Sequence, residues 1–352
     1  MAFVIPRSYG DVWDPFHSKE QMLNMWKSFA DTHQIPYRSV GKTYEGNDIL
    51  MFKLGNPNGG RVLWDAYLHG NEDYGAEILY MLLEWLFSGD PRAERILERN
   101  HILFIPVVNV DARHWAGTHE RGNSHFYSES PRYGVDLNRN FRTGWRHQGL
   151  YSDTYSGPSP ASEPETQVLR AVFDSYRPSF YVNLHSGAGP YAAYYRGGNT
   201  ELTQEAITRV NEIGFEMGVT PYSTRGFGSS GFAIGDAGRE FGASAWLIEV
   251  KTGWSHTDDD WNRLENVFFP KNLILFISMC EICESDISAS IARADVNNDG
   301  IIDILDLTIV SLSYGAFEGE PDYSQEADMT EDGVVDIRDV STVARYVGRA
   351  VP

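Results

Sequence analysis

The chain has 352 residues, a formal net charge of −20 at pH 7, and 42% hydrophobic and 13% aromatic residues. This length accommodates one large and one small domain, and the apolar content is sufficient for a packed core rather than a disordered chain. The negative charge repels nucleic acids and anionic membranes, so we expect neither as a partner. No uninterrupted apolar run approaches the roughly 18 residues needed to span a bilayer.

Short apolar runs alternate with amphipathic helical patterns over residues 62–283. An early helix is expected at 19–30, followed by strand-like stretches up to residue 54. Further strands are expected at 61–68, 101–108, 180–184 and 244–248, and further helices at 76–87, 162–176 and 202–217. Pro106 predicts an interruption or an edge position in its strand. We therefore expect an α/β fold with a mixed, mainly parallel sheet covered by helices on both faces.

Two other features of the sequence bear on the cellular compartment of the protein. Residues 1–7 lack the long apolar segment of a signal peptide, so either a signal was removed or the protein stays inside the cell. Cys280 and Cys283 are too few for a disulfide framework, and they end an apolar helical run. Their position favours buried thiols over a redox pair.

Two histidines and two glutamates follow the ends of predicted strands. His69 and Glu72 come directly after the strand at 61–68, His185 follows the strand at 180–184, and Glu249 follows the strand at 244–248. Ligands in an open α/β sheet bind beyond the carboxyl ends of its strands. Two imidazoles and one carboxylate form an open zinc site, and a second carboxylate nearby can activate water. The long irregular stretch at 109–160 is also typical of functional loops.

Asp136 lies in that irregular stretch. It is a candidate acceptor for the second ring N–H of a ligand histidine, because ligand imidazoles usually donate that proton to a carboxylate or carbonyl. The alternative is an ordinary turn aspartate.

Residues 15–283 resemble the zinc carboxypeptidases of the carboxypeptidase A/B type. The resemblance rests on the order and spacing of seven motifs, which are Gly41-Lys-Thr-Tyr-Glu-Gly46, His69-Gly-Asn-Glu72, Gly134-Val-Asp-Leu-Asn-Arg-Asn-Phe141, Tyr155-Ser-Gly-Pro158, Ser162-Glu-Pro-Glu-Thr166, Asn183-Leu-His-Ser186 and Ile248-Glu-Val-Lys-Thr-Gly253. It implies one catalytic Zn²⁺ held by His69, Glu72 and His185.

The resemblance also implies roles around the metal. Asn138 and Arg139 would hold the terminal carboxylate of the substrate, and a guanidinium suits that task because it can form two parallel hydrogen bonds. Arg121, or alternatively Arg113, would polarise the scissile carbonyl. Glu249 would act as general base and pass a proton to the leaving amine.

One position departs from the family pattern. The family usually carries a tyrosine in a mobile loop about twenty residues before its catalytic glutamate, and Phe227 occupies that place here, with Tyr222 slightly upstream. Phe227 would remove a hydroxyl contact with substrate and weaken binding. The pocket for the terminal side chain would include Ala233, Ile234 and Asp236. An apolar lining would favour substrates with an apolar C-terminal side chain, and an inward aspartate would favour a basic one. We favour an apolar or mixed preference.

The composition changes near residue 285, where 285–293 reads as a short linker between a catalytic domain (1–284) and a small all-α domain (294–352). Two acidic segments then repeat at a spacing of 33 residues, each with glycine at position six of a calcium-loop pattern. The pattern predicts two structural Ca²⁺ ions. The expected ligands of the first are Asp295, Asn297, Asp299, Ile301 (carbonyl), Asp303 and Asp306. Those of the second are Asp328, Thr330, Asp332, Val334 (carbonyl), Asp336 and Asp339.

This tail is similar to dockerin domains, which bind cohesins, often through polar pairs at loop positions ten and eleven. Ile304-Leu305 and Ile337-Arg338 stand there instead. The expected partner is therefore a cohesin-like protein, or the tail packs against the peptidase. Calcium loops and a dockerin-like tail favour an extracellular setting.

The sequence as a whole predicts a secreted zinc metallocarboxypeptidase that hydrolyses C-terminal peptide bonds. The alternatives are a peptidase acting on bacterial cell-wall stem peptides and a vestigial peptidase that serves as a binding or scaffold-docking protein. A deacylase sharing the zinc fold is disfavoured by the motifs at 134–141 and 162–166.

Overall fold

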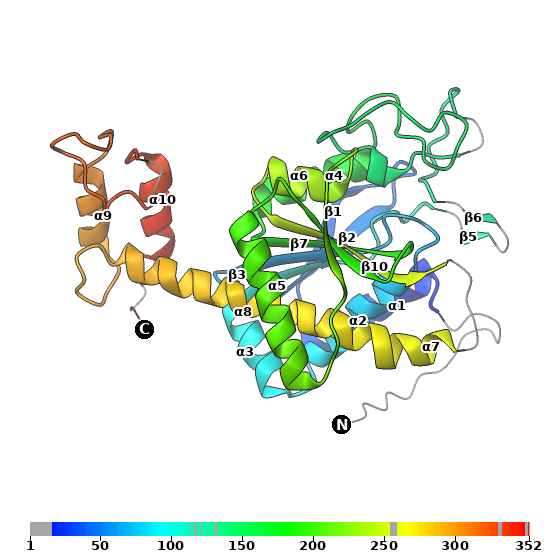
Figure 1. The fold of residues 1–352 in the computed structure, drawn as a ribbon, viewed down its shortest axis with the longest axis horizontal. Helices are drawn as coiled ribbons and strands as arrows, with labels where there is room; N and C mark the ends of the chain where they lie inside the picture. Colours follow the sequence, from blue (N-terminus) through cyan, green and yellow to red (C-terminus); the bar gives the residue numbers. More distant parts are fainter. Residues whose placement is uncertain are drawn as a thin grey trace. The chain divides into compact units, whose positions relative to one another are not determined.

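A mixed sheet organises the first part of the chain (Figure 1). The computed structural model describes residues 16–352 apart from 113, 116, 117, 120, 131, 132, 254–258, 330–332, 349, 350 and 352. The chain divides into two compact units, Met1–Cys283 and Glu284–Pro352.

The sheet order is β1-β2-β4-β3-β7-β10-β8-β9. Its strands are β1 Tyr37–Lys42, β2 Asp48–Gly55, β3 Gly60–Asp65, β4 Asn100–Ile105, β7 Phe180–Gly187, β8 Tyr191–Tyr195, β9 Thr224–Phe227 and β10 Ser244–Thr252. A separate hairpin pairs β5 (His114–Trp115) with β6 (Thr118–His119). The four central strands β4, β3, β7 and β10 run parallel, whereas β1, β2 and β8 join by antiparallel pairing. The predicted mixed, mainly parallel sheet is confirmed.

Helices cover both faces of this sheet (Figure 1). The helical segments of the first unit are α1 Lys19–His33, α2 Tyr74–Leu86, α3 Pro91–Arg99, η1 Leu137–Arg139, α4 Pro164–Tyr176, α5 Thr200–Met217, α6 Ala233–Arg239, α7 Asp260–Arg263, η2 Leu264–Phe268 and α8 Phe269–Ala294. Buried side chains of α1, α2, α3, α5 and α8 form one core, and those of α4 and α6 form the other. Alternation along the strands supplies both cores, because successive side chains point to opposite faces.

Pro106 interrupts its strand and does not mark an edge: β4 lies between β2 and β3, and it ends at Ile105, so the missing N–H of Pro106 falls outside the ladder. The expected linker at 285–293 is helical and forms the end of α8. That segment contains neither glycine nor proline, so nothing in it stops the helix.

One stretch among the described residues, Asp260–Glu284, is long and apolar enough to cross a membrane by length and composition alone. Of its most apolar window, 67% is buried within the protein. Ile274, Phe276 and Ile277 lie in the core on one face of the sheet, so the apolar character of this stretch is explained by packing.

The second unit contains α9 (Ile304–Leu312) and α10 (Ile337–Tyr346). Its own apolar core includes Ile302, Val310, Val335 and Val343. The predicted small all-α unit is thus present, with each of its two acidic loops leading into a helix.

Trp26 of α1 provides a test of the first core. Its side chain is fully buried, with ring centroids 4.8 Å from Phe52 and 5.7 Å from Phe104. We predict that Trp26→Ala lowers the free energy of unfolding by about 3–5 kcal/mol, because truncating a buried aromatic leaves a cavity. Phe215→Ala is the matched control, since Phe215 is 91% exposed, and should cost about 0.5 kcal/mol or less. Urea unfolding followed by far-UV circular dichroism measures both, and equal costs would contradict this packing.

Candidate functional site

Three parallel strands bring the predicted ligands to one edge of the sheet. β3 ends at Asp65, and the left-handed backbone of Tyr67 (φ 56°) turns the chain before His69. On the neighbouring strands, His185 of β7 lies directly opposite Glu249 of β10. The carboxyl ends of parallel strands meet at a common edge, so residues more than 100 positions apart converge there.

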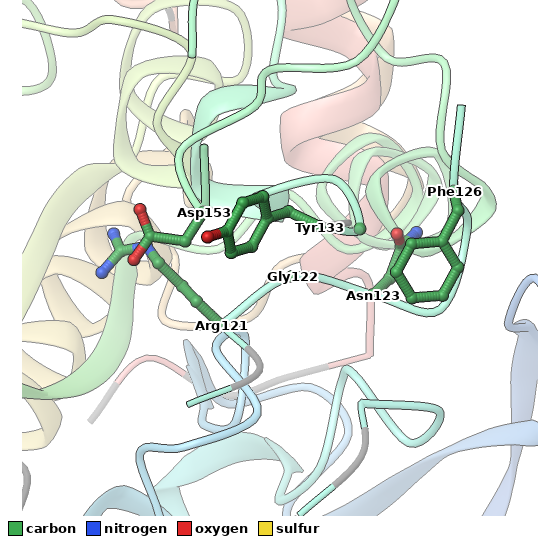
Figure 2. A pocket seen from close by; sticks show the side chains of 7 residues that line it. Arg121, Gly122, Asn123, Phe126, Tyr133 and Asp153 are labelled. Carbon is green, nitrogen blue, oxygen red and sulfur yellow. The ribbon is translucent and has the colours of Figure 1, made fainter. Parts of the chain in front are cut away.

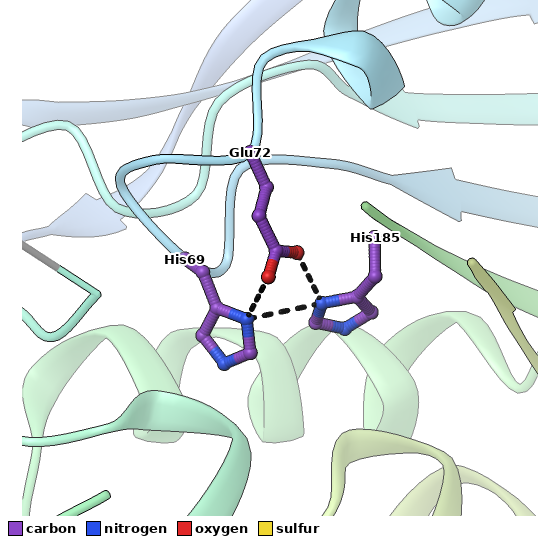
Figure 3. Close-up of side chains that lie close together, drawn as sticks. All are labelled: His69, Glu72 and His185. Atoms are coloured by element: carbon purple, nitrogen blue, oxygen red, sulfur yellow. Dashed lines mark hydrogen bonds and ion pairs between the residues drawn. The ribbon is translucent and has the colours of Figure 1, made fainter. Parts of the chain in front are cut away.

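Figure 3 shows the side chains of His69, Glu72 and His185 pointing toward one another. Nδ1 of His69 lies 2.8 Å from Oε1 of Glu72, and Nδ1 of His185 lies 2.7 Å from Oε2. The two Nδ1 atoms are 3.2 Å apart, and all three residues are buried. Within the described part of the chain, no other three His, Cys, Asp or Glu side chains gather so closely. Two ring nitrogens and a carboxylate facing one another away from water fit a shared zinc ion.

Asp136 links this group to Arg121. Oδ1 of Asp136 lies 3.0 Å from Nε2 of His69, and Oδ2 accepts a 2.7 Å hydrogen bond from Nε of Arg121. Burial on its own would raise the pKa of Asp136, but the charges of Arg121, His69 and Arg139 and the hydrogen bond to His69 together hold that pKa well below its usual range. Asp136 is therefore an anionic acceptor that fixes the His69 ring with Nδ1 turned toward Glu72 and His185.

Arg121 borders a hollow within the irregular stretch at 109–160 (Figure 2). Its Nη1 atom lies 4.0 Å from Oε1 of Glu72. The hollow is lined by Arg121, Gly122, Asn123, Phe126, Tyr133, Gly134 and Asp153. The alternative, Arg113, lies outside the described residues.

Two of the sequence motifs support the loop that carries Arg121. The amide of Asn123 donates to Glu163 (2.8 Å) and to Glu165 (3.2 Å), both buried. The other oxygen of Glu165 accepts from the backbone N–H of Tyr44 (2.9 Å). Burial raises the pKa of Glu165 to about 7. The motifs at 41–46 and 162–166 therefore meet beneath the loop and anchor it.

Glu249 lies beside the ligands on β10 and makes few contacts of its own. One carboxylate oxygen accepts a 3.1 Å hydrogen bond from the backbone N–H of Ala188. Burial, with the charge of Glu72 adding to it, raises the pKa of Glu249 to about 7. A carboxylate with a pKa near neutrality suits proton transfer in both directions.

Asn138 and Arg139 follow Asp136 in the short helix η1. Oδ1 of Asn138 accepts from the N–H of Ala233 (3.0 Å), and its Nδ2 lies 3.2 Å from Nε2 of His185. Arg139 donates to the carbonyl of Asn138 (2.9 Å), and its guanidinium lies 4.7 Å from the centre of the Phe232 ring. The Arg139 side chain keeps 21% of its surface exposed, whereas Asn138 is buried and already engaged on both amide atoms.

Phe227 and Tyr222 lie in different surroundings. Phe227 ends β9, is partly buried, and has its ring centre 6.0 Å from that of Tyr191 and 4.9 Å from the guanidinium of Arg225. Tyr222 belongs to the core on the opposite face, where its hydroxyl accepts from Asn272 (2.9 Å). Of the two residues, Phe227 is the one that packs on the sheet face carrying α6.

Asp236 is not a free acid in a substrate pocket. It is fully buried in α6, where its carboxylate accepts from the N–H groups of Arg142 (3.2 Å) and Thr143 (2.6 Å). It also pairs with the guanidinium of Arg170. Ala233 and Ile234 are buried in the same helix.

The first acidic loop of the second unit is held by its own carboxylates. Asp295 accepts from the N–H groups of Asp299 (3.0 Å) and Gly300 (2.9 Å), and Asp306 accepts from Asn297 (3.1 Å) and Asp303 (2.8 Å). Gly300 has φ +87°, a conformation that glycine adopts without strain.

The second loop repeats this arrangement where it is described. Asp328 accepts from Gly333 (2.8 Å), and Asp339 accepts from Asp336 (2.7 Å). Gly333 has φ +80°. The expected ligands Thr330 and Asp332 lie outside the described residues.

The comparisons with known proteins agree with this geometry. The zinc carboxypeptidase family model matches residues 22–220, more than half of the chain. The chain belongs to the zinc carboxypeptidase family. The dockerin type I domain model matches residues 286–348. The first unit and the tail thus match two separate families, as the motifs predicted.

Several carboxypeptidases are similar in sequence to part of this chain. Human carboxypeptidase A6 is 30% identical over 203 residues, which cover 52% of this chain and 46% of that protein. Carboxypeptidase B of Astacus astacus is 25% identical over 270 residues, covering 68% of this chain and 87% of that protein. Apart from such cases, the chain spans about half the length of the curated relatives it matches.

Solved structures share the fold. The carboxypeptidase A from Helicoverpa armigera has a TM-score of 0.62 at 19% identity and covers 77% of this chain and 74% of its own. Thrombin activatable fibrinolysis inhibitor has a TM-score of 0.63 at 15% identity, covering 80% and 81%.

Sequence reasoning overlooked a column of polar side chains beneath His185. Tyr181 and Asn183 lie on the same face of β7 as His185, and both donate to the buried Asp65 of β3. The signal was the alternation of these polar residues with the apolar Phe180, Val182 and Leu184 along one strand.

The Asp236–Arg170 pair gives a prediction for this region. Asp236→Asn should lower the free energy of unfolding by about 1.5–3 kcal/mol, because it removes the buried charge that pairs with Arg170 and leaves that guanidinium only its pair with Glu240. Asp174→Asn is the control, since Asp174 pairs with Arg177 at the surface, where such pairs contribute about 0–1 kcal/mol. Urea unfolding compares the two variants. An Asp236→Asn cost as small as that of the control would mean that Asp236 is not held as described.

Proposed function

We propose that this protein is a zinc-dependent metallocarboxypeptidase that hydrolyses the C-terminal peptide bond of peptides. The single observation that carries the proposal is the buried group of His69, Glu72 and His185, with Glu249 opposite His185 on the adjacent strand. Three ligands leave a fourth position open, which is typical of catalytic rather than structural zinc sites. Membership of the zinc carboxypeptidase family supports the same reaction.

His69, Glu72 and His185 would hold one zinc ion, which supplies a Lewis acid that acidifies a water molecule and polarises the scissile carbonyl. Glu249 takes a proton from the attacking water and delivers it to the leaving amine. Its pKa of about 7 supports both transfers. Arg121 donates to the developing negative charge on the carbonyl oxygen, and its bond to Asp136 holds it in place for that contact.

Arg139 would bind the terminal carboxylate of the substrate. Its side chain is part exposed and is oriented by the Asn138 carbonyl and the Phe232 ring. Asn138 would reach substrate only by exchanging its contacts with Ala233 and His185, so we assign the larger share of binding to Arg139. Asp236 is engaged by Arg170, which supports an apolar or mixed preference for the terminal side chain.

For the second unit we propose two structural calcium ions, with the acidic loop residues as ligands and Asp295 and Asp306 at the two ends of the first loop. The match to dockerin type I domains supports a cohesin-like protein partner and an extracellular setting. Ile304, Leu305 and Ile337 are 53–67% exposed, so the contact surface would be more apolar than the polar pairs of many dockerins. Packing of this surface against the peptidase itself is the alternative.

The peptidase assignment predicts release of single residues from free C-termini. We expect the zinc-loaded protein to shorten unblocked peptides by one residue and to leave the same peptides untouched when their C-termini are amidated, because the amide removes the charge that Arg139 binds. Glu249→Gln should lower the rate by about 10²–10⁴-fold while zinc content stays the same. Mass spectrometry of the products, with zinc measured by atomic emission, provides both readouts.

Muropeptides should be tested as substrates alongside these peptides. Cleavage of muropeptides alone would favour the cell-wall alternative. A wild-type rate no higher than that of Glu249→Gln on every substrate would favour a vestigial peptidase.

Calcium titration tests the second unit. Isothermal calorimetry of the full chain should show two binding events, and Asp295→Ala should remove one of them, because position one of the loop is a direct ligand. Asp322→Ala, an exposed acid between the two loops, should leave both events in place. A silent titration of the wild-type protein would refute the calcium proposal without affecting the zinc site.

A further inference from the structure

Two asparagines favour opposite tautomers of the His185 ring. Its Nε2 atom is in hydrogen-bond contact with Oδ1 of Asn183 and lies 3.2 Å from Nδ2 of Asn138. The oxygen of Asn183 favours a proton on Nε2, whereas the amide nitrogen of Asn138 favours a lone pair there. A neutral imidazole carries one proton, so the first arrangement leaves Nδ1 free as a metal ligand, and the second blocks it.

Asp65 sets the orientation of the Asn183 amide. Nδ2 of Asn183 donates to Oδ1 of Asp65, its in-register neighbour on β3. A carboxylate oxygen accepts and cannot donate, so the amide must turn its nitrogen to Asp65 and its oxygen to His185. The other oxygen of Asp65 accepts from the hydroxyl of Tyr181 (2.8 Å). Asp65, Tyr181 and Asn183 are all fully buried, so water is not available to replace these partners.

We propose that Asp65 is a positioning residue for the zinc site: through Asn183 it keeps the proton of His185 on Nε2 and so leaves Nδ1 free to bind the metal. The inference rests on the proposed zinc site and deepens it. Burial raises the pKa of Asp65 to about 7, but the orientation holds in both protonation states, because the acid form retains a carbonyl oxygen for Asn183 while its hydroxyl faces Tyr181.

The two ligand histidines are thus oriented by different means. His69 contacts the carboxylate of Asp136 directly, and that carboxylate also binds Arg121. His185 contacts a neutral amide, which separates it from the carboxylate of Asp65 by one residue. The neutral Asn183 amide therefore fixes which nitrogen of His185 carries the proton without placing a charge beside the ring. A partner of this kind typically changes metal affinity by about 10–100-fold when it is removed.

Asp65→Ala is the informative variant. Without Asp65 the Asn183 amide is free to turn over, and Asn138 then favours the Nδ1–H form of His185. We expect zinc affinity, measured by chelator competition on the full chain, to fall by about 10–100-fold. Without zinc the Glu72 carboxylate, 2.7 Å from Nδ1 of His185, favours a proton on Nδ1, so the ring is followed in a Glu72→Ala background. In that zinc-free background labelled with ¹⁵N-histidine, we expect Asp65→Ala to move the His185 ring shifts from the Nε2–H form toward the Nδ1–H form. A purely structural role for Asp65 would alter thermal stability and leave the ring shifts unchanged.

Two further variants act as controls. Asp65→Asn can still present an oxygen to Asn183 and an amide N–H to Tyr181, so it should restore most of the zinc affinity and the wild-type ring shifts. Tyr181→Phe removes a donor to Asp65 without touching Asn183, so it should leave both readouts unchanged. Should Asp65→Ala not fold, Asn183→Ala removes the acceptor of Nε2–H directly and should give the same loss.

The outcomes separate this inference from the proposed function. Unchanged affinity and unchanged ring shifts in a folded Asp65→Ala protein would overturn the inference while leaving the zinc site intact. A His185 ring already in the Nδ1–H form in the Glu72→Ala protein with Asp65 intact would overturn it as well. Failure of the wild-type protein to bind zinc would instead overturn the proposed function.

Discussion

The site depends on one constraint: polar atoms removed from water need partners. Nδ1 of His69, Nδ1 of His185 and the Glu72 carboxylate face one another in the protein interior. Each Nδ1 lies within hydrogen-bond distance of a different Glu72 oxygen, and a cation shared by the three groups satisfies the same atoms, as membership of the zinc carboxypeptidase family supports. The sheet imposes the convergence, because three parallel strands end at the same edge.

Charged and neutral side chains both support this group. Asp136 and Arg121 contact the ligands directly and carry full charges, whereas Asn138 and Asn183 contact His185 as neutral amides. Farther out, Glu163 and Glu165 anchor the Arg121 loop through Asn123. These contacts restrict the orientation of each ligand ring.

Much of this could be predicted from the sequence. The zinc carboxypeptidase resemblance and the mixed sheet are confirmed, because strand alternation, strand-end polar residues and motif spacing are local signals. The short elements β8, β9 and α6 were not predicted, since four to seven residues containing small side chains carry little periodic signal. The contacts of Asp65 and Asp236 could not be predicted from the sequence, because their partners come from strands and helices that are remote along the chain.

The metal itself is the most direct test of this account. Zinc K-edge X-ray absorption of the zinc-loaded full chain reports the atoms bound to the ion. The account predicts two imidazole nitrogens at about 2.0–2.1 Å together with oxygen ligands at roughly 2.0–2.2 Å, and loss of one imidazole in each of the variants His69→Ala and His185→Ala. A spectrum with sulfur ligands, or one that is unchanged in both variants, would contradict it.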